Sequence, residues 1–141
     1  MLYIGMDLGT SAVKLLLMDV DGKIKKIASR TYDLSFPHPG WSEQNPADWY
    51  EQSIDGLKEL LAECDKSRVA GISFGGQMHG LVTLDERDEV IRPAILWNDG
   101  RTAEETDYLN QGIGKETLSG YTANIAFAGF TAPKILWMQK H

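Results

Sequence analysis

The stretch LYIGMDLGTSAVKLLLM, residues 2–18, decides the fold of this chain. Residues 2–7 form an apolar run that is typical of a short buried strand. Gly9-Thr10-Ser11 interrupts the run, and residues 12–18 follow as a second apolar run with side chains suited to a strand. The sequence therefore predicts that the chain opens with a strand, a turn and a second strand.

A hairpin signal extends this pattern. Asp21-Gly22 is a strong two-residue hairpin signal, so we expect residues 23–34 to form a third strand, antiparallel to the second. Lys25, Lys26 and Arg30 are charges of the kind that protect the open edge of a sheet. We therefore expect three consecutive strands with an exposed third member.

A helix and a crossover are predicted next. Asn45 is a candidate N-cap and Pro46 fits the first helical position. Residues 69–74 are almost continuously apolar, which favours a strand covered on both faces, and a strand-helix-strand order favours parallel pairing. The apolar residues of the helix recur at spacings of three and four, which predicts one buried stripe: Tyr50, Ile54, Leu57, Leu61 and Cys64.

The second half of the chain is predicted to hold shorter elements. We expect strands at residues 81–84 and 94–97, with a turn at residues 85–89 between them. The pattern Thr102-x-x-Glu105 is a capping box, which predicts a helix through Leu109. These elements alternate helix and strand, as in a layered α/β domain.

The last predicted helix begins at Pro133 and has about two turns before His141, so we expect the chain to end inside an element. The predicted fold class is thus α/β but incomplete. It has a mixed sheet, in which an antiparallel triplet is joined by a crossover to parallel strands, and flanking helices.

Composition and charge exclude several classes of function. The chain has 141 residues, and 14 Lys and Arg against 20 Asp and Glu give a net charge of −6. No basic cluster suits a nucleic-acid backbone, and no stretch approaches the roughly 20 apolar residues of a membrane helix. The start reaches Asp7 without a basic region, unlike a signal peptide. Cys64 is the only cysteine, which fits a cytoplasmic protein.

The turn after the first strand is the first candidate for chemistry. Asp7 at the strand end suits a hydrated Mg²⁺, Gly9 lets the backbone approach phosphate oxygens, and Thr10 and Ser11 add hydroxyl donors. An ordinary turn is the alternative, because all four residue types are common in turns. The position between two apolar strands favours the phosphate interpretation.

Two further segments carry side chains suited to a ligand. Met78 and His79 lie between glycines at the end of a predicted strand, and a loop histidine bonded to backbone is the equally supported alternative. Trp97, Asn98 and Asp99 combine an aromatic face with polar groups that suit sugar hydroxyls. The alternative for this segment is helix capping by Asn98 or Asp99, with a solvated Arg101.

Taken together, these segments resemble the FGGY family of carbohydrate kinases, and within it the xylulose kinase branch. The resemblance covers essentially the whole chain. It rests on five pieces in the family's order: residues 7–11 (DLGTS), 39–46 (PGWSEQNP), 76–80 (GQMHG), 94–101 (AILWNDGR) and 129–134 (GFTAPK).

The resemblance implies a ribonuclease H-like, actin-type ATPase fold that closes on ATP, Mg²⁺ and a sugar. It implies that Asp7 handles the metal and that Gly9, Thr10 and Ser11 meet the phosphates of ATP. It further implies a sugar pocket lined by Met78, His79, Trp97, Asn98 and Asp99.

Members of the family are several times longer than 141 residues. The resemblance therefore implies that residues 1–141 are the N-terminal part of the first, sugar-binding domain, and that the catalytic aspartate and the ATP-binding lobe lie outside them. The parent would transfer the γ-phosphoryl group of ATP to the 5-hydroxyl of D-xylulose, and these residues alone are expected to be inactive.

Other functions remain open at this point. They are a kinase for another pentulose, gluconate or a polyol, and a non-catalytic sugar-binding or interaction fragment. We expect a small-molecule partner and neither nucleic acid nor membrane, and we consider a homodimer as the assembled form.

Overall fold

The computed structural model describes all residues, 1–141, and its chain divides into two compact units. The first unit comprises residues 1–33 and 46–77. The second unit comprises residues 34–45 and 78–141. Each unit is therefore assembled from two separate stretches of sequence.

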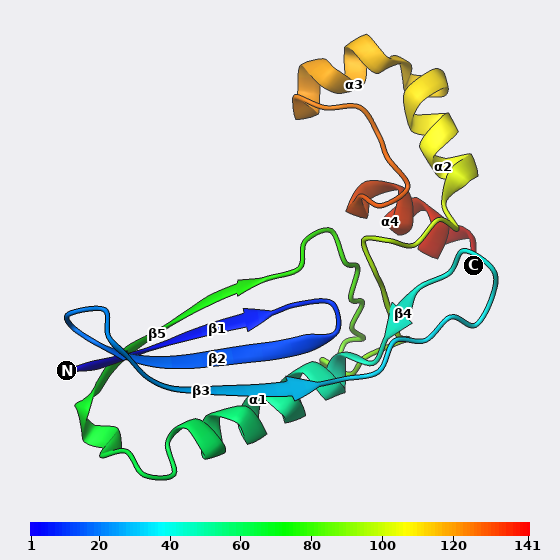
Figure 1. Ribbon diagram of the computed structural model, residues 1–141. Helices are drawn as coiled ribbons and strands as arrows, with labels where there is room; N and C mark the ends of the chain where they lie inside the picture. Colours follow the sequence, from blue (N-terminus) through cyan, green and yellow to red (C-terminus); the bar gives the residue numbers. More distant parts are fainter. The chain divides into compact units, whose positions relative to one another are not determined.

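The first unit is a four-stranded mixed sheet in the order β3-β2-β1-β5 (Figure 1). β1 pairs antiparallel with β2 and parallel with β5, while β2 pairs antiparallel with β3. Its elements are β1 (Leu2–Leu8), β2 (Ala12–Asp19), β3 (Ile24–Thr31), α1 (Pro46–Leu60), the 3₁₀ helix η1 (Lys66–Arg68) and β5 (Val69–Gly76). The predicted antiparallel triplet and parallel crossover are confirmed.

The hairpin between β2 and β3 forms where Asp21-Gly22 predicts it. Gly22 has a φ of 78°, which glycine adopts without the steric cost that a side chain would add. The Gly22 N–H donates to the Asp19 carbonyl at 3.0 Å, and the Asp19 carboxylate accepts from the N–H groups of Asp21 and Lys23. Asp19 therefore closes the turn, and the bond and ion pair from Lys25 hold the pKa of Asp19 below its usual value.

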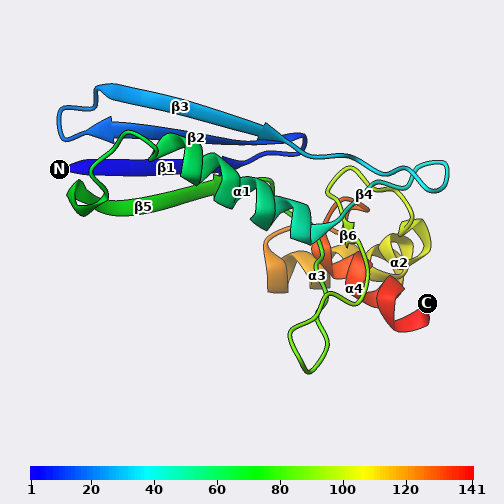
Figure 2. The same cartoon turned by 90° about the horizontal axis from the view of Figure 1, so that it is seen from below.

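Helix α1 lies along one face of the sheet (Figure 2) and buries alternate strand residues there. The buried set is Leu2, Ile4, Met6, Val13, Leu15, Leu17 and Ala28, with Tyr32 and Leu60. Gly56 gives the closest approach, since a Cβ there would lie 2.4 Å from Leu15 Cδ1. Leu57, Leu61 and Cys64 pack against this core as predicted, and Ile54 is partly buried. The prediction for Tyr50 is wrong, because this residue is 70% exposed.

The expectation that residues 69–74 are covered on both faces is also wrong. β5 has β1 on one side and no strand on the other, and Ile72 and Phe74 are 44% and 64% exposed. An apolar run is consistent with double burial but does not supply the covering elements. In these 141 residues β5 is an edge strand.

The second unit is built of short elements. β4 (Glu43–Gln44) pairs antiparallel with β6 (Ala94–Ile95). The helices are α2 (Ala103–Asp107), the π-helix η2 (Tyr108–Gly114), α3 (Lys115–Thr122) and α4 (Thr131–Lys140). Residues 81–84 form single bridges at Leu81 and Leu84 and not the strand expected there. No helix in the chain is long and apolar enough to span a membrane.

The predicted capping box at the start of α2 is wrong. The Thr102 side chain makes no cap bond and instead donates to the Ala128 carbonyl at 3.2 Å. The Glu105 carboxylate pairs with Lys140 of α4 at 2.5 Å. Tertiary partners therefore take both side chains away from the helix start, although a helix still begins at Ala103.

Candidate functional site

The turn after β1 presents an acidic strand end beside open backbone. Asp7 is exposed and lies next to Gly75 of β5, where a Cβ would be only 3.7 Å from Asp7 Oδ1. In the register of β1 and β2, Asp7 lies opposite Lys14. A cavity of about 460 Å³ on the open face of the sheet is lined by Asp7, Lys14 and Ser73, among others. This strand end leaves space beside the carboxylate for a ligand.

Tyr32 fixes the turn itself. The Gly9 N–H donates to the Ala12 carbonyl at 3.0 Å, and the Tyr32 hydroxyl donates to the Gly9 carbonyl in a short hydrogen bond. The Tyr32 N–H donates to the Ser11 carbonyl at 3.3 Å. Burial, with a smaller contribution from the Asp7 charge, raises the pKa of Tyr32. Sequence analysis missed Tyr32, because nothing in its local pattern signals a partner 23 residues earlier.

The donor set at Asp7 suits one kind of metal. No cluster of three or more His, Cys, Asp or Glu side chains in the chain could hold an ion by itself. Mg²⁺ commonly binds proteins through one or two carboxylates, with water and substrate phosphates as its other ligands. A single exposed carboxylate beside a glycine turn therefore fits a phosphate-bound Mg²⁺.

In the second unit, His79 occupies an uncommon backbone conformation. Its φ is 62°, in the left-handed region, which costs a non-glycine residue about 1–3 kcal/mol. Its ring stacks on Phe130, with centroids 4.4 Å apart and planes inclined by 25°. His79 and Phe130 line a cavity of about 310 Å³ together with residues of η2, α3 and α4. Met78, 62% exposed, precedes it.

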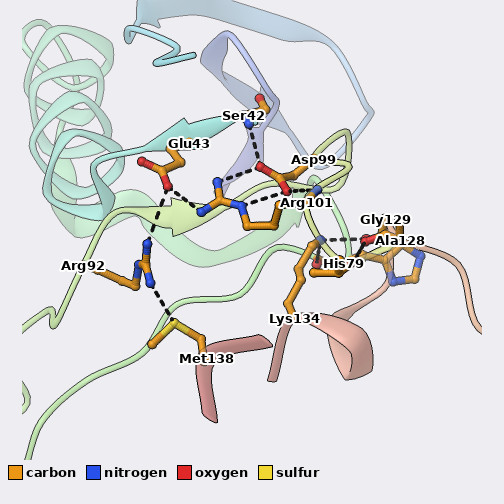
Figure 3. A network of polar contacts seen from close by, with 11 residues as sticks. Ser42, Glu43, His79, Arg92, Asp99, Arg101, Ala128, Gly129, Lys134 and Met138 are labelled. Atoms are coloured by element: carbon orange, nitrogen blue, oxygen red, sulfur yellow. Dashed lines mark hydrogen bonds and ion pairs between the residues drawn. The ribbon is translucent and has the colours of Figure 1, made fainter. Parts of the chain in front are cut away.

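Lys134 of α4 holds the His79 turn from inside (Figure 3). The lysine is fully buried, and its Nζ donates to the carbonyls of His79 and Gly129, both at 2.7 Å. Burial lowers the pKa of Lys134 to about 8; the Asp99 charge opposes this shift and the Arg101 charge adds to it. In the sequence, Lys134 stands out only as part of the 129–134 motif. A lysine beside Pro133 in an apolar helix was the available signal.

Asp99 and Arg101 form a buried network next to this segment (Figure 3). The Asp99 carboxylate accepts from Arg101 Nε at 2.9 Å and from Arg101 Nη2 at 2.7 Å. It also accepts from the backbone N–H groups of Arg101 and Ser42. Arg101 in turn pairs with Glu43 at 2.7 Å and stacks 3.7 Å above the Trp41 ring.

The network overturns the alternative of a solvated Arg101. Arg101 is 1% exposed and not solvated, because two carboxylates and an aromatic face replace water around it. The Asp99 side chain is fully buried, and both of its oxygens accept hydrogen bonds from Arg101 or Ser42. Asp99 instead holds the backbone next to Trp97 and Asn98, which are both exposed.

Two predicted sugar-binding segments meet within the second unit. A Cβ on Gly129 would lie 2.4 Å from the Trp97 carbonyl oxygen, so the Trp97 and Gly129 backbones touch. Lys134 then connects Gly129 to His79. Asn98 lines a different cavity, of about 410 Å³, formed with residues 36–42. Asp7, Gly9, Thr10 and Ser11 all belong to the first unit.

The first unit is thus an α/β unit with a four-stranded mixed sheet, whose first hairpin turn carries one carboxylate and one glycine, Asp7 and Gly9. The chain belongs to the FGGY family of carbohydrate kinases, and residues 2–141 match the N-terminal domain of that family. The chain thus has the ribonuclease H-like, actin-type ATPase fold that the resemblance implies.

Known relatives agree in sequence and in structure. The chain is 45% identical over 140 residues to a xylulose kinase from Bacillus subtilis, covering 98% of this chain and 28% of the relative. It is 44% identical over 140 residues to a xylulose kinase from Klebsiella pneumoniae, covering 99% and 29%. A crystal structure of xylulose kinase from Rhodospirillum rubrum superposes with a TM-score of 0.94 at 33% identity, covering 100% and 29%. The chain thus spans less than a third of these relatives.

Proposed function

We propose that the protein containing these residues is an ATP-dependent kinase that phosphorylates D-xylulose on its 5-hydroxyl. The observation that carries the proposal is the 44–45% identity to xylulose kinases over nearly the whole chain. That similarity includes the turn of the first unit and, separately, the Met78-His79 segment of the second unit. Residues 1–141 would be the N-terminal part of its sugar-binding domain.

The first unit would handle phosphate and metal. Asp7 would hold Mg²⁺, which when bound neutralises charge on the transferred phosphoryl group. Gly9, Thr10 and Ser11 would bring backbone N–H groups and hydroxyls to the phosphate oxygens of ATP. Tyr32 supports this role because its bonds to Gly9 and Ser11 hold the turn in one conformation before a ligand arrives.

The second unit would recognise the sugar. Trp97 offers an aromatic face 46% exposed, and the exposed Met78 offers an apolar contact. His79 and Asn98 bring hydrogen-bonding groups suited to hydroxyls, and each lines a cavity. Asp99 would act through the loop that it holds and not by touching the sugar.

The rest of the reaction needs groups outside these residues. In-line transfer needs a general base within hydrogen-bond reach of the attacking hydroxyl. By resemblance that base is an aspartate beyond residue 141, and the adenosine site lies in another lobe. A cytoplasmic location and a homodimeric assembly complete the proposal.

A coupled assay for ADP release tests the proposal on the full-length protein. It would be run with Mg²⁺ and ATP against D-xylulose, a second pentulose, D-gluconate and glycerol. We expect the highest kcat/KM with D-xylulose. A higher kcat/KM with gluconate or glycerol would assign the protein to another branch of the family. If none of the compounds on the panel causes ADP release, the kinase proposal is contradicted.

A further inference from the structure

We propose that Lys134 is a positioning residue for sugar recognition, whose buried ammonium locks the His79 turn to the Gly129–Phe130 turn and so fixes the His79 imidazole. This inference rests on the proposed function, since it assigns His79 to the sugar. It concerns a fully buried lysine whose hydrogen bonds go to backbone carbonyls.

The burial of Lys134 requires an explanation of its own. Lysine is almost never fully buried unless its charge is paired, yet the bonding partners of Lys134 Nζ are two carbonyl oxygens. The nearby Asp99 carboxylate is occupied by Arg101 and Ser42. A buried ammonium held only by backbone carbonyls is therefore placed to organise backbone.

The backbone that it organises is strained. The His79 carbonyl accepts from Lys134 Nζ at 2.7 Å and from Thr131 Oγ1 at 3.3 Å, so two donors of α4 fix its direction. Fixing this carbonyl fixes the peptide plane that follows His79. We infer that this helps to hold His79 in its left-handed conformation, from which it would otherwise relax. Hydrogen bonds from a charged donor are the stronger kind and suit this task.

The same ammonium also fixes what lies beneath the imidazole. Gly129, the second acceptor, precedes Phe130, on whose ring His79 stacks. Gly129 in turn lies against the Trp97 carbonyl without room for a side chain. Lys134 therefore joins three segments: the His79 turn, its stacking partner and the backbone of Trp97.

The test compares variants of the full-length protein in steady-state kinetics. Lys134→Met keeps the length of the side chain and removes the ammonium. We expect the KM for D-xylulose to rise about tenfold to a hundredfold, as for loss of charged hydrogen bonds, with the KM for ATP within twofold of wild type. Lys134→Arg keeps a charged donor and should recover at least part of the sugar affinity.

Lys140→Met is the matched control, because Lys140 lies on the same helix but pairs with Glu105. It should leave the KM for D-xylulose within twofold of wild type. An unchanged sugar KM in Lys134→Met, or equal increases in the sugar and ATP KM values, would overturn the proposal. If Lys134→Met does not fold, Thr131→Val decides: a sugar KM raised about two- to fivefold supports the proposal, and no change overturns it.

A crystal structure of Lys134→Met separates this inference from the proposed function. We expect His79 to leave the left-handed region and its ring to leave Phe130. If the backbone conformation of His79 and its stacking on Phe130 are unchanged, the positioning role of Lys134 is overturned, even if the variant is an active kinase. If wild type phosphorylates no sugar on the panel, the proposed function fails, and the structure still decides whether Lys134 sets the His79 conformation.

Discussion

Replacing Arg101 with methionine should destabilise the second unit by about 3–5 kcal/mol, the usual cost of removing one partner from a buried ion pair. The substitution leaves the Asp99 carboxylate, fully buried, and the Glu43 carboxylate, 9% exposed, without their common partner. Arg92 does not replace it, since its Nη2 lies 4.0 Å from Glu43 and its guanidinium stacks on Trp137. The expected loss is a large share of the 5–15 kcal/mol that stabilises a typical domain.

Urea unfolding followed by tryptophan fluorescence measures this loss. Within residues 1–141, Trp41, Trp97 and Trp137 lie in the second unit and Trp49 lies in the first, so the tryptophan signal of these residues reports mainly on the second unit. Arg101→Lys should recover less than half of the stability, because an ammonium cannot make the two parallel bonds to Asp99 while reaching Glu43.

Lys58→Met is the control for the Arg101 experiment. It removes an exposed pair with Asp55 and should cost less than about 0.5 kcal/mol. A loss below about 1 kcal/mol in Arg101→Met, or full recovery by Arg101→Lys, would refute the argument that a bidentate buried network holds this loop.

Three other changes follow from the site. His79→Ala should weaken sugar binding by about 1–3 kcal/mol in calorimetry and leave ATP binding nearly intact, whereas equal weakening would make His79 structural. Gly129→Ala should lower the free energy of unfolding by at least about 2 kcal/mol, because its Cβ meets the Trp97 backbone; a wild-type midpoint in urea would refute the close approach. The free energy of unfolding of wild type, relative to that of Lys134→Met, should rise by at most about 3 kcal/mol between about pH 8 and pH 10.5. The reason is that folded Lys134 loses its proton near pH 8, while unfolded Lys134 keeps it until about pH 10.5. A difference that does not change with pH would contradict the lowered pKa of Lys134.

The sheet could be predicted because its signals are local. The alternating burial of β1 and β2, the Asp21-Gly22 turn and the Pro46 helix start each depend on residues close in sequence. The burial of Tyr50 and of residues 69–74 could not be predicted correctly. An apolar side chain indicates that burial is favourable, but it does not indicate which element covers it. The capping box failed for a related reason, since partners 26 and 35 residues away bind Thr102 and Glu105.

The candidate site residues show the same contrast between local signals and long-range contacts. The exposed candidates, Asp7, His79, Trp97 and Asn98, can be proposed from residue type and position together with the family resemblance. The supports beneath them, Tyr32, Arg101 and Lys134, act through bonds that span 23 to 58 residues where they leave their own segment. Long-range pairing of this kind leaves no periodic pattern in a sequence. Residue type therefore suggests the chemistry, and only the fold identifies what holds it in place.

The most direct test of the proposed kinase is ³¹P NMR of the full-length protein with D-xylulose, ATP and Mg²⁺, beside Asp7→Ala. We predict one sugar 5-phosphate for each ADP formed in wild type. Asp7→Ala should give the same product with kcat lowered at least a hundredfold, and its sugar KM should stay within a fewfold of wild type, because metal and phosphate positioning act mainly on the transition state. ADP formation without a sugar phosphate, or near wild-type turnover by Asp7→Ala at saturating Mg²⁺ and ATP, would contradict the account.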